Sequence, residues 1–505
     1  MKRRYRIGFA CRELNERGIL PAQALLAPLE VRCLVVETDT GPACWAVFDL
    51  TALTIDECLA IRAAVAAAVG CRRGSVTVHC THTHSVPSHF HAFPVEALAV
   101  QAAAAAREAR GRMRPFRVAA ATVDVGSRFS LRRRKFIPGL GTFTVWYGYR
   151  LENGRADGAA RVREQAARML GPRARRIPEL AGPLWFDDPV DPLAQGLAFI
   201  GDDGAVLGSL IRFSAHPHTT SHIARLRYHP DFPGFARGAV ERRLGGRCIY
   251  LTGPCGDLSP KEEMRFRLLP AAQRPAGVGW YFGPCYWHKA AEPGEALRAA
   301  QGMGEKLAAA IVARLVGCVR GRPAGPRARA TAPAVVCARS VPLTVPIRAD
   351  YAASPGQARA AQAAATRRLF AWQQAGCASP WELRALADHA HQLGLEVADV
   401  GVFPAGAIAA RRVVAELGLL RLGDIVLAGL PGEPCVGTSL RLRANTLGEK
   451  LWTVSLVNGW FGYLPDSFGR LSGGYEGVRT PLPADGLLAY EAQAGRAIRM
   501  LAPDP

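Results

Sequence analysis

A short stretch near residue 80 constrains this chain most, because it joins a strand pattern directly to two histidines. From Val76 to Cys80 the residues alternate with the period of a β-strand, and His82 and His84 follow at once. Residues two apart on an extended chain point to the same side, so both imidazoles can enter one pocket. Imidazole is the commonest metal ligand and acid–base group near neutral pH, so this stretch suggests one ligand and one catalytic partner.

The composition excludes several classes of protein. The 505 residues suffice for two or three domains or one large one, and the hydrophobic content of 49% is that of a globular protein. The net charge of +21 comes mostly from arginines spread along the chain, which argues for compositional bias and against nucleic-acid binding. The 13 cysteines include no Cys-x-x-Cys pair. Without a signal-peptide h-region or a membrane-length apolar run, we expect a cytoplasmic protein with no transmembrane segment.

The apolar pattern mixes strand-like and helix-like segments and predicts an α/β fold of the mixed α+β kind. We expect one large catalytic domain over residues 1–505, in which residues 351–415 form a helical segment. Residues 130–180 are rich in Gly and Arg, and we expect loops around the mouth of the site there. Strands are expected at 5–10, 31–37, 45–48, 76–80, 116–125, 197–200, 206–213, 248–251, 425–430 and 452–457, and helices at 54–69, 95–111, 233–245 and 295–316.

Four of the apolar strands lead into polar residues of catalytic type. A strand end supports a metal ligand rigidly, and strand ends that converge can assemble a complete site. Two histidines and one glutamate form a catalytic zinc set with an open position for water, although they also accept other divalent ions. The residues at these strand ends are His82 and His84, His216, Glu433, and the Asn458–Tyr463 loop.

Several short segments occur in an order that resembles one known family. The chain resembles the N-terminal catalytic domain of the neutral/alkaline, non-lysosomal ceramidases, and within that family its shorter bacterial relatives. The resemblance runs from the first strands to about residue 480, which is nearly the whole chain. The matching segments are Thr81–Ser85, Phe213–Pro217, Gly256–Pro260, Gly432-Glu433, Gly462-Tyr463 and Gly474–Glu476.

The resemblance implies a zinc site and its catalytic partners. It implies His84 as the catalytic partner of the metal-bound water, and Tyr475, twelve residues after Tyr463, as a group near the scissile carbonyl. The family also has an arginine in an Asn-Arg element, for which Arg132 or Arg133 is a loose match because the Asn is missing. The implied ligands of Zn²⁺ are His82, His216, Glu433 and Tyr463.

Two departures from the family bear on substrate and mechanism. Where the ceramidases have a functional serine, this chain has Gly253, so no hydroxyl is offered and the chemistry would rest on metal-bound water. The chain continues only to residue 505 after Tyr475, so we expect neither the family's C-terminal immunoglobulin-like domain nor its secretion signal. Ceramide is therefore not a secure substrate assignment.

Three functions remain open from the sequence. The first is a zinc-dependent hydrolase of a linear, non-peptide amide, N-acyl and lipid-like amides included. The second is a zinc hydrolase of an ester or a cyclic amide, because Gly253 alters the pocket. The third is a metal-binding scaffold without catalytic activity. The partner in the first two cases is a small molecule, and the oligomeric state is left open.

Other residues near the motifs carry weaker expectations. Asp49 follows a strand and is a candidate partner for a metal-bound histidine. His79 has the opposite strand parity to His82 and should face away from the site. Asp231 lies in a motif that resembles a family element and is expected to line the site. His89 and His91 are expected to be solvated, one of His218, His222 and His229 could be an alternative ligand, and Trp280–Trp287 could line an apolar pocket or the core.

Overall fold

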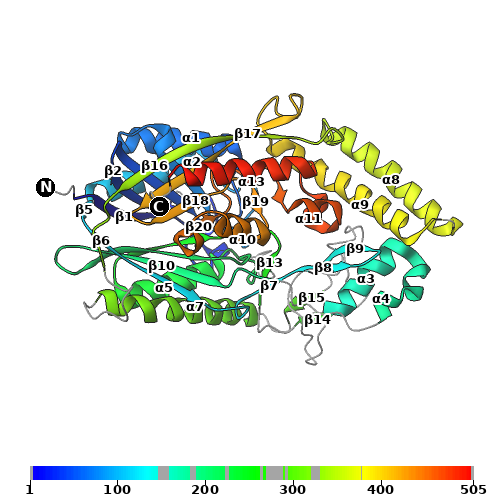
Figure 1. Ribbon diagram of the computed structural model, residues 1–505, viewed down its shortest axis with the longest axis horizontal. Helices are drawn as coiled ribbons and strands as arrows, with labels where there is room; N and C mark the ends of the chain where they lie inside the picture. Colours follow the sequence, from blue (N-terminus) through cyan, green and yellow to red (C-terminus); the bar gives the residue numbers. More distant parts are fainter. Residues whose placement is uncertain are drawn as a thin grey trace.

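The predicted mixed α+β class is confirmed by the computed structural model, in which helices surround several sheets (Figure 1). His222 and the aromatic stretch Trp280–Trp287 lie outside the described residues, so the expectations for them stay untested. Within the described part of the chain, no helix is both long and apolar enough to cross a membrane. The structure describes residues 4–16, 18–145, 158–181, 189–221, 227–261, 266–268, 288–290, 294–319, 330–376 and 378–501.

The first sheet carries the His-Thr-His stretch. It has the strand order β4-β3-β2-β1-β5, and β3 and β4 run parallel, joined through helix α1. Helix α1 begins at a capping box between Thr54 and Glu57 and ends at Gly70, which has a left-handed φ of 66°. Helix α2 packs against α1, β1 and β2. The bounds are β1 Arg6–Glu13, β2 Glu30–Thr38, β3 Gly41–Phe48, β4 Val76–Cys80, β5 Arg114–Pro115, α1 Ile55–Val69 and α2 Val95–Gly111.

The second sheet has the order β12-β11-β10-β6, and helices α5 and α7 cover it. The strands expected at 197–200 and 206–213 are present as β10 and β11, which pair antiparallel as a hairpin. Strands β11 and β12 are parallel, with Phe213 opposite Thr252, so the residues that follow both strands emerge at one edge. The bounds are β6 Arg117–Asp124, β10 Leu193–Ile200, β11 Val206–Phe213, β12 Arg247–Thr252, α5 Asp231–Leu244 and α7 Glu295–Val319.

The third sheet has the order β16-β17-β18-β20, and helix α13 packs on β16 (Figure 1). Strands β18 and β20 are parallel, so the chain leaves both at the same edge toward Glu433 and the Asn458–Tyr463 loop. The bounds are β16 Val336–Pro346, β17 Arg412–Leu422, β18 Ile425–Gly429, β20 Leu451–Val454, α10 Val436–Ala444 and α13 Ala484–Arg499.

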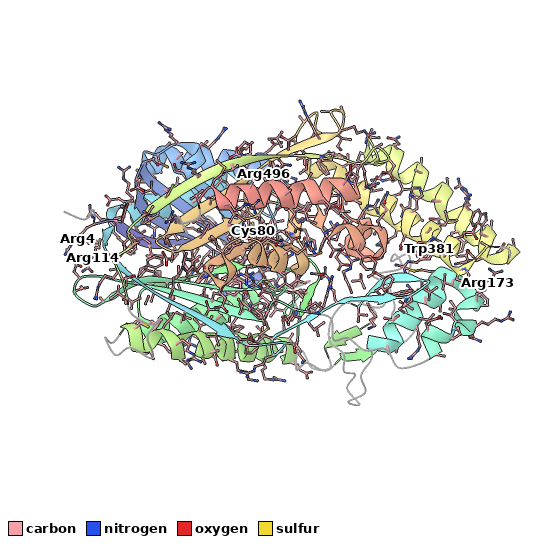
Figure 2. All side chains as sticks on the ribbon, viewed as in Figure 1. Arg4, Cys80, Arg114, Arg173, Trp381 and Arg496 are labelled. Carbon is pink, nitrogen blue, oxygen red and sulfur yellow. The ribbon has the colours of Figure 1, made fainter. Side chains whose placement is uncertain are left out.

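One buried cluster joins the three sheets. Phe9 and Trp45 of the first sheet, Phe199 of the second, and Leu420 and Trp452 of the third all belong to it. Burying an apolar side chain of this size contributes about 1.5–3 kcal/mol, so the cluster holds the sheets in a fixed relation. The ends of the three parallel strand pairs, one pair from each sheet, therefore lie in one region of the molecule. Figure 2 shows Cys80, the last residue of β4, in the middle of the molecule between Arg4 and Arg173 at opposite ends.

The expectation that residues 130–180 form loops is wrong. The described part of this region contains three short strands, the helix α3 and the start of α4, and the buried residues Val162, Ala166 and Met169 of α3 follow helical spacing. Strands of three or four residues are too short for a two-residue period to be recognised, and arginines between the apolar positions of α3 obscured its pattern. The bounds here are β7 Ser130–Arg132, β8 Arg134–Ile137, β9 Gly141–Thr144, α3 Gly158–Leu170 and α4 Pro178–Ala181.

Short elements and a helical pair complete the structure. The helical segment expected within 351–415 is present as α8 and α9, which pack together at one end of the molecule (Figure 1). Strand β17 already begins at Arg412, so the helical part is shorter than expected. The bounds are α8 Pro355–Ala375, α9 Pro380–Asp399, β13 Leu258–Pro260, β14 Phe266–Leu268, β15 His288–Ala290, β19 Glu433–Pro434, β21 Tyr463–Leu464, α11 Ser467–Leu471 and α12 Gly474–Val478.

Candidate metal centre

The backbone around His82 turns its imidazole inward. The amide of His82 donates to the Leu50 carbonyl at 2.9 Å, and its φ of 69° lies in the left-handed region, a conformation that costs a non-glycine residue about 1–3 kcal/mol. Nδ1 lies 2.6 Å from the Thr51 carbonyl oxygen, so this nitrogen carries the proton and donates. The other nitrogen, Nε2, is then left with a lone pair that faces the site.

His216 is held in the same way from the second sheet. Its Nδ1 lies 2.6 Å from the Cys255 carbonyl oxygen and 3.1 Å from that of Leu258, so Nδ1 donates and Nε2 faces the site. Burial, followed by the charge of Arg133, lowers the pKa of His216 to about 4. The imidazole is therefore neutral at physiological pH, which is the form that binds a metal.

Glu433 enters from the third sheet region through the short parallel pair β19–β21. One carboxylate oxygen, Oε2, accepts a hydrogen bond of 2.9 Å from the Trp460 indole nitrogen. The other, Oε1, lies 3.2 Å from His82 Nε2 and 3.0 Å from His216 Nε2. The indole donor stabilises the ionised carboxylate, which is the form that binds a metal.

These three atoms form a triangle that fits a divalent cation. His82 Nε2 and His216 Nε2 are 3.1 Å apart, which completes the two distances to Glu433. Ligand atoms about 2.0–2.1 Å from a tetrahedral zinc ion lie about 3.3 Å from one another. Two imidazole lone pairs and a carboxylate oxygen repel at this separation unless a cation lies among them. The donor set therefore suits a divalent ion, and the structure brings together three of the four predicted ligands.

His84 lies at the open side of this triangle. Its Nε2 is 3.4 Å from His82 Nε2, and the nitrogens of His82, His84 and His216 fall within 4.8 Å of one another. His84 could therefore act as a third nitrogen ligand or as a base beside the metal. Its side chain is only partly buried, and that burial together with the neighbouring histidines lowers its pKa well below the usual value.

Tyr463 and Tyr475 form an aromatic wall next to Glu433. Tyr463 is paired with Glu433 in the β19–β21 register, and its hydroxyl lies 3.5 Å from Arg133 Nη2. Burial, with the nearby charge of Glu433, raises the pKa of Tyr463 well above its usual value. The Tyr475 ring stands edge-on to that of Tyr463 at a centroid distance of 5.3 Å. Both predicted tyrosines therefore lie beside the candidate metal site.

The structure separates the two candidate arginines. Arg132 forms an ion pair with Asp257 at 2.8 Å. Arg133 is fully buried, donates to Glu476 at 2.7 Å, and carries its guanidinium carbon to 5.9 Å from the centre of the Tyr463 ring. Adjacent residues near a strand point to opposite sides, so only one of the two faces the tyrosine wall. That residue is Arg133, whereas Arg132 holds the loop of Asp257.

Gly253 occupies a position where no side chain fits. A Cβ added there would lie 2.2 Å from Ser214 Oγ and 2.3 Å from Arg212 Nη2. Arg212 is itself fully buried and paired with Asp191 at 2.6 Å. The space beside Gly253 is therefore filled by the Ser214 hydroxyl and the Arg212 guanidinium group, which explains the glycine physically.

Several expectations for neighbouring residues are corrected or placed. Among the described residues, the structure gives Asp49 no histidine partner; Asp49 accepts two hydrogen bonds from Arg237, at 2.6 and 2.7 Å. The partners that orient the ligating histidines are backbone carbonyls, which no sequence pattern identifies. Asp231 accepts from Thr220 at 2.6 Å and so braces the loop after His216.

The remaining histidines take different positions around the centre. His79 faces away as expected, bonded to the Ser455 carbonyl at 2.8 Å. His229 accepts from the Asp231 amide at 2.8 Å, which is a structural contact. The His218 ring lies 5.5 Å from that of His216. His89 and His91 are exposed, as expected, but the His89 ring lies edge-on to His84 at 4.9 Å.

Two functional candidates were missed from the sequence. Trp460 binds Glu433, and Arg479 lies over the rings of Trp460, Tyr463 and Tyr475. Trp460 falls inside the Asn458–Tyr463 loop that was already singled out. The signal for Arg479 was its position four residues after Tyr475, which places both on one side of a helical turn.

Comparisons with known proteins concern the fold of the whole chain. No family model and no curated protein matches the sequence. Among solved structures, neutral ceramidase from Pseudomonas aeruginosa aligns with a TM-score of 0.60 and 16% identity, over 99% of this chain and 75% of that one. A ceramidase complexed with C2 aligns with a TM-score of 0.59 and 15% identity, over 99% and 76%. The chain therefore has the fold of the ceramidases.

Proposed function

We propose that this protein is a zinc-dependent hydrolase of a linear N-acyl amide, with lipid-like amides as the first substrates to test. The observation that supports this most is the triangle of His82 Nε2, His216 Nε2 and Glu433 Oε1, with sides between 3.0 and 3.2 Å. The shared fold with two solved ceramidases supports the same reaction class.

The residues around the triangle have the chemistry that amide hydrolysis requires. A divalent ion bound there would polarise a substrate carbonyl and lower the pKa of a bound water to about 7. His84 is neutral and partly exposed beside His82, so it can accept a proton and pass it to the leaving nitrogen. Tyr475 offers a phenolic hydroxyl that can donate to the carbonyl oxygen.

Gly253 favours direct attack by water over a covalent route. Residue 253 itself carries no hydroxyl, and the Ser214 hydroxyl beside it donates to Asp191 at 3.1 Å. Direct attack by water serves an ester as well as an amide, so ester hydrolysis is the second candidate. Ester hydrolysis would be favoured over amide hydrolysis if no side chain of the site protonated the leaving group.

Metal content and a substrate panel test the proposal together. Elemental analysis of the purified protein should find about one zinc per chain, and both His82→Ala and Glu433→Ala should lose it. The metal-loaded protein is then assayed on N-acyl sphingoid bases, short N-acyl amines and the matching esters. Amide cleavage supports the proposal, ester cleavage alone supports the second candidate, and bound metal without any cleavage indicates a scaffold. Absence of stoichiometric metal would refute all three.

A further inference from the structure

Arg479 lies at the centre of the aromatic wall beside the metal site. Its guanidinium carbon is 5.0 Å from the centre of the Trp460 ring, 5.7 Å from that of Tyr463 and 5.6 Å from that of Tyr475. Trp460 in turn binds Glu433, so Arg479 contacts groups next to the metal ligands. Cations over aromatic faces attract them by about 0.5–2 kcal/mol each, so one residue orders three rings.

A carboxylate from a distant segment fixes this guanidinium. Asp399, the last residue of α9, accepts from Arg479 Nε at 2.9 Å and from Nη2 at 2.8 Å. A two-point contact of this kind fixes the plane of the guanidinium as well as its position. The Asp399 side chain is 6% exposed and that of Arg479 is 19% exposed, so water competes little with the pair.

The remaining guanidinium nitrogen contacts Tyr475. Arg479 Nη1 donates a hydrogen bond to the Tyr475 hydroxyl oxygen. Arginine has donors only, so the tyrosine oxygen must be the acceptor in this bond. Arg479 therefore fixes the position of the Tyr475 hydroxyl oxygen without taking up its proton.

We infer that Arg479, clamped by Asp399, is the positioning residue that aims the Tyr475 hydroxyl at the substrate carbonyl. The aim toward a carbonyl rests on the proposed function, whereas the orienting contact does not. This inference also gives the α8–α9 segment a role, because that segment supplies Asp399. The helical pair then completes the site from outside the three sheets.

A double-mutant cycle tests the catalytic half of the inference. Tyr475→Phe and Arg479→Lys are each expected to lower kcat/KM of the best amide substrate about 10–100-fold, somewhat below the cost of losing a full oxyanion donor. Since both act through one hydroxyl, the double variant should lose no more than about threefold beyond Tyr475→Phe alone. Losses that multiply in the double variant would overturn the inference.

Glu396 provides the matched control on the same helix. It lies one turn before Asp399 and pairs with Arg348, and both side chains are more buried than those of the Asp399–Arg479 pair. Glu396→Gln breaks a comparable ion pair without touching Tyr475. Its effect on kcat/KM should be small and should multiply with that of Tyr475→Phe. If Glu396→Gln is as strongly coupled to Tyr475→Phe as Arg479→Lys is, the effect is general loosening of α9 and the inference fails.

A spectroscopic measurement separates this inference from the proposed function. In protein labelled with ¹³Cζ-tyrosine, the NMR resonance lost in Tyr475→Phe reports the hydrogen bonding of that hydroxyl. Arg479→Lys and Asp399→Asn should both move it, and Glu396→Gln should not. This readout needs no substrate, so failure to find any amide cleaved would refute only the proposed function. An unmoved Tyr475 resonance, or loss of metal from Arg479→Lys, would overturn the positioning role.

Discussion

The two halves of the site are held in different ways. At the metal edge, His82, His216 and Glu433 each follow a strand, and backbone carbonyls orient both imidazoles. At the aromatic wall, Tyr475 is held by side chains, Arg479 and Asp399, which come from segments 80 residues apart. A hydrogen bond to a backbone carbonyl survives most substitutions, whereas one substitution in either partner's side chain removes an ion pair. The metal edge should therefore tolerate changes around it, and the wall should not.

Removing a ligand should have the largest effect and separate the two halves. Glu433→Ala leaves two imidazoles for the metal, so affinity for zinc should fall by more than about 100-fold, beyond the cost of losing an outer partner. Asp399→Asn should keep full metal occupancy, because it acts only on the wall. Chelator competition measures both. Equal metal loss in the two variants would show that the halves are not independent.

The buried carboxylate of Asp191, behind the metal edge, should contribute strongly to the free energy of unfolding. Asp191 is fully buried between Arg212 and Arg443, at 2.6 and 2.8 Å. Asp191→Asn leaves both guanidinium groups without their counter-charge, so the free energy of unfolding should fall by about 3–5 kcal/mol. Urea denaturation at neutral pH measures this. As a control, Asp424→Asn removes an exposed pair with Lys450 and should cost less than about 1 kcal/mol.

The same carboxylate predicts a pH dependence. Burial alone would raise the pKa of Asp191, but Arg212 and Arg443 lower it below its usual value. A depressed folded pKa contributes stability that is complete above the unfolded value of about 3.9 and is lost as the pH falls through the folded pKa. Wild type should therefore lose this contribution in acid, and Asp191→Asn should show a flatter curve there. Parallel curves would contradict the prediction.

Introducing a side chain at residue 253 should lower the free energy of unfolding by less than Asp191→Asn does. Gly253→Ser forces a Cβ against Arg212 and Ser214, and overpacking of this kind costs about 1–3 kcal/mol. The midpoint of urea unfolding should fall accordingly, without gain of activity. Gly111→Ser is a suitable control, because nothing lies within 4 Å of a Cβ there. A stable and more active Gly253→Ser protein would show that Arg212 moves aside easily.

Trp460 links the two halves, and its removal should have the smallest effect. Trp460→Phe keeps a ring for Arg479 to stack on but removes the indole donor to Glu433. Loss of such an outer partner weakens metal binding about 10-fold, or about 1.4 kcal/mol. Trp372→Phe, on α8, should leave the metal affinity unchanged. An unaltered affinity in Trp460→Phe would mean that the strand ends alone orient Glu433.

Several long elements were predictable because their patterns repeat. Strands such as β10 and β11 carry several alternating apolar residues, and helix α7 repeats its apolar face over many turns. The short strands β7 to β9 and the arginine-interrupted helix α3 were missed, and so were the long strands β16 and β17 and the helix α13. Their form depends on partners elsewhere, such as Leu258–Pro260 for β7.

The sequence by itself determined which residue types stand at the strand ends, and therefore the kind of centre they could build. The position of a candidate ligand directly after a strand can be read from the local sequence, because the strand fixes the direction of the residues that follow it. Only the tertiary structure decided that Arg133 faces Tyr463 while Arg132 does not, and that Arg212 fills the space at Gly253. It also decided that Asp49 binds Arg237, and that Asp399 holds Arg479. These contacts join segments far apart in the chain, and their partners are selected by packing, which no local pattern records.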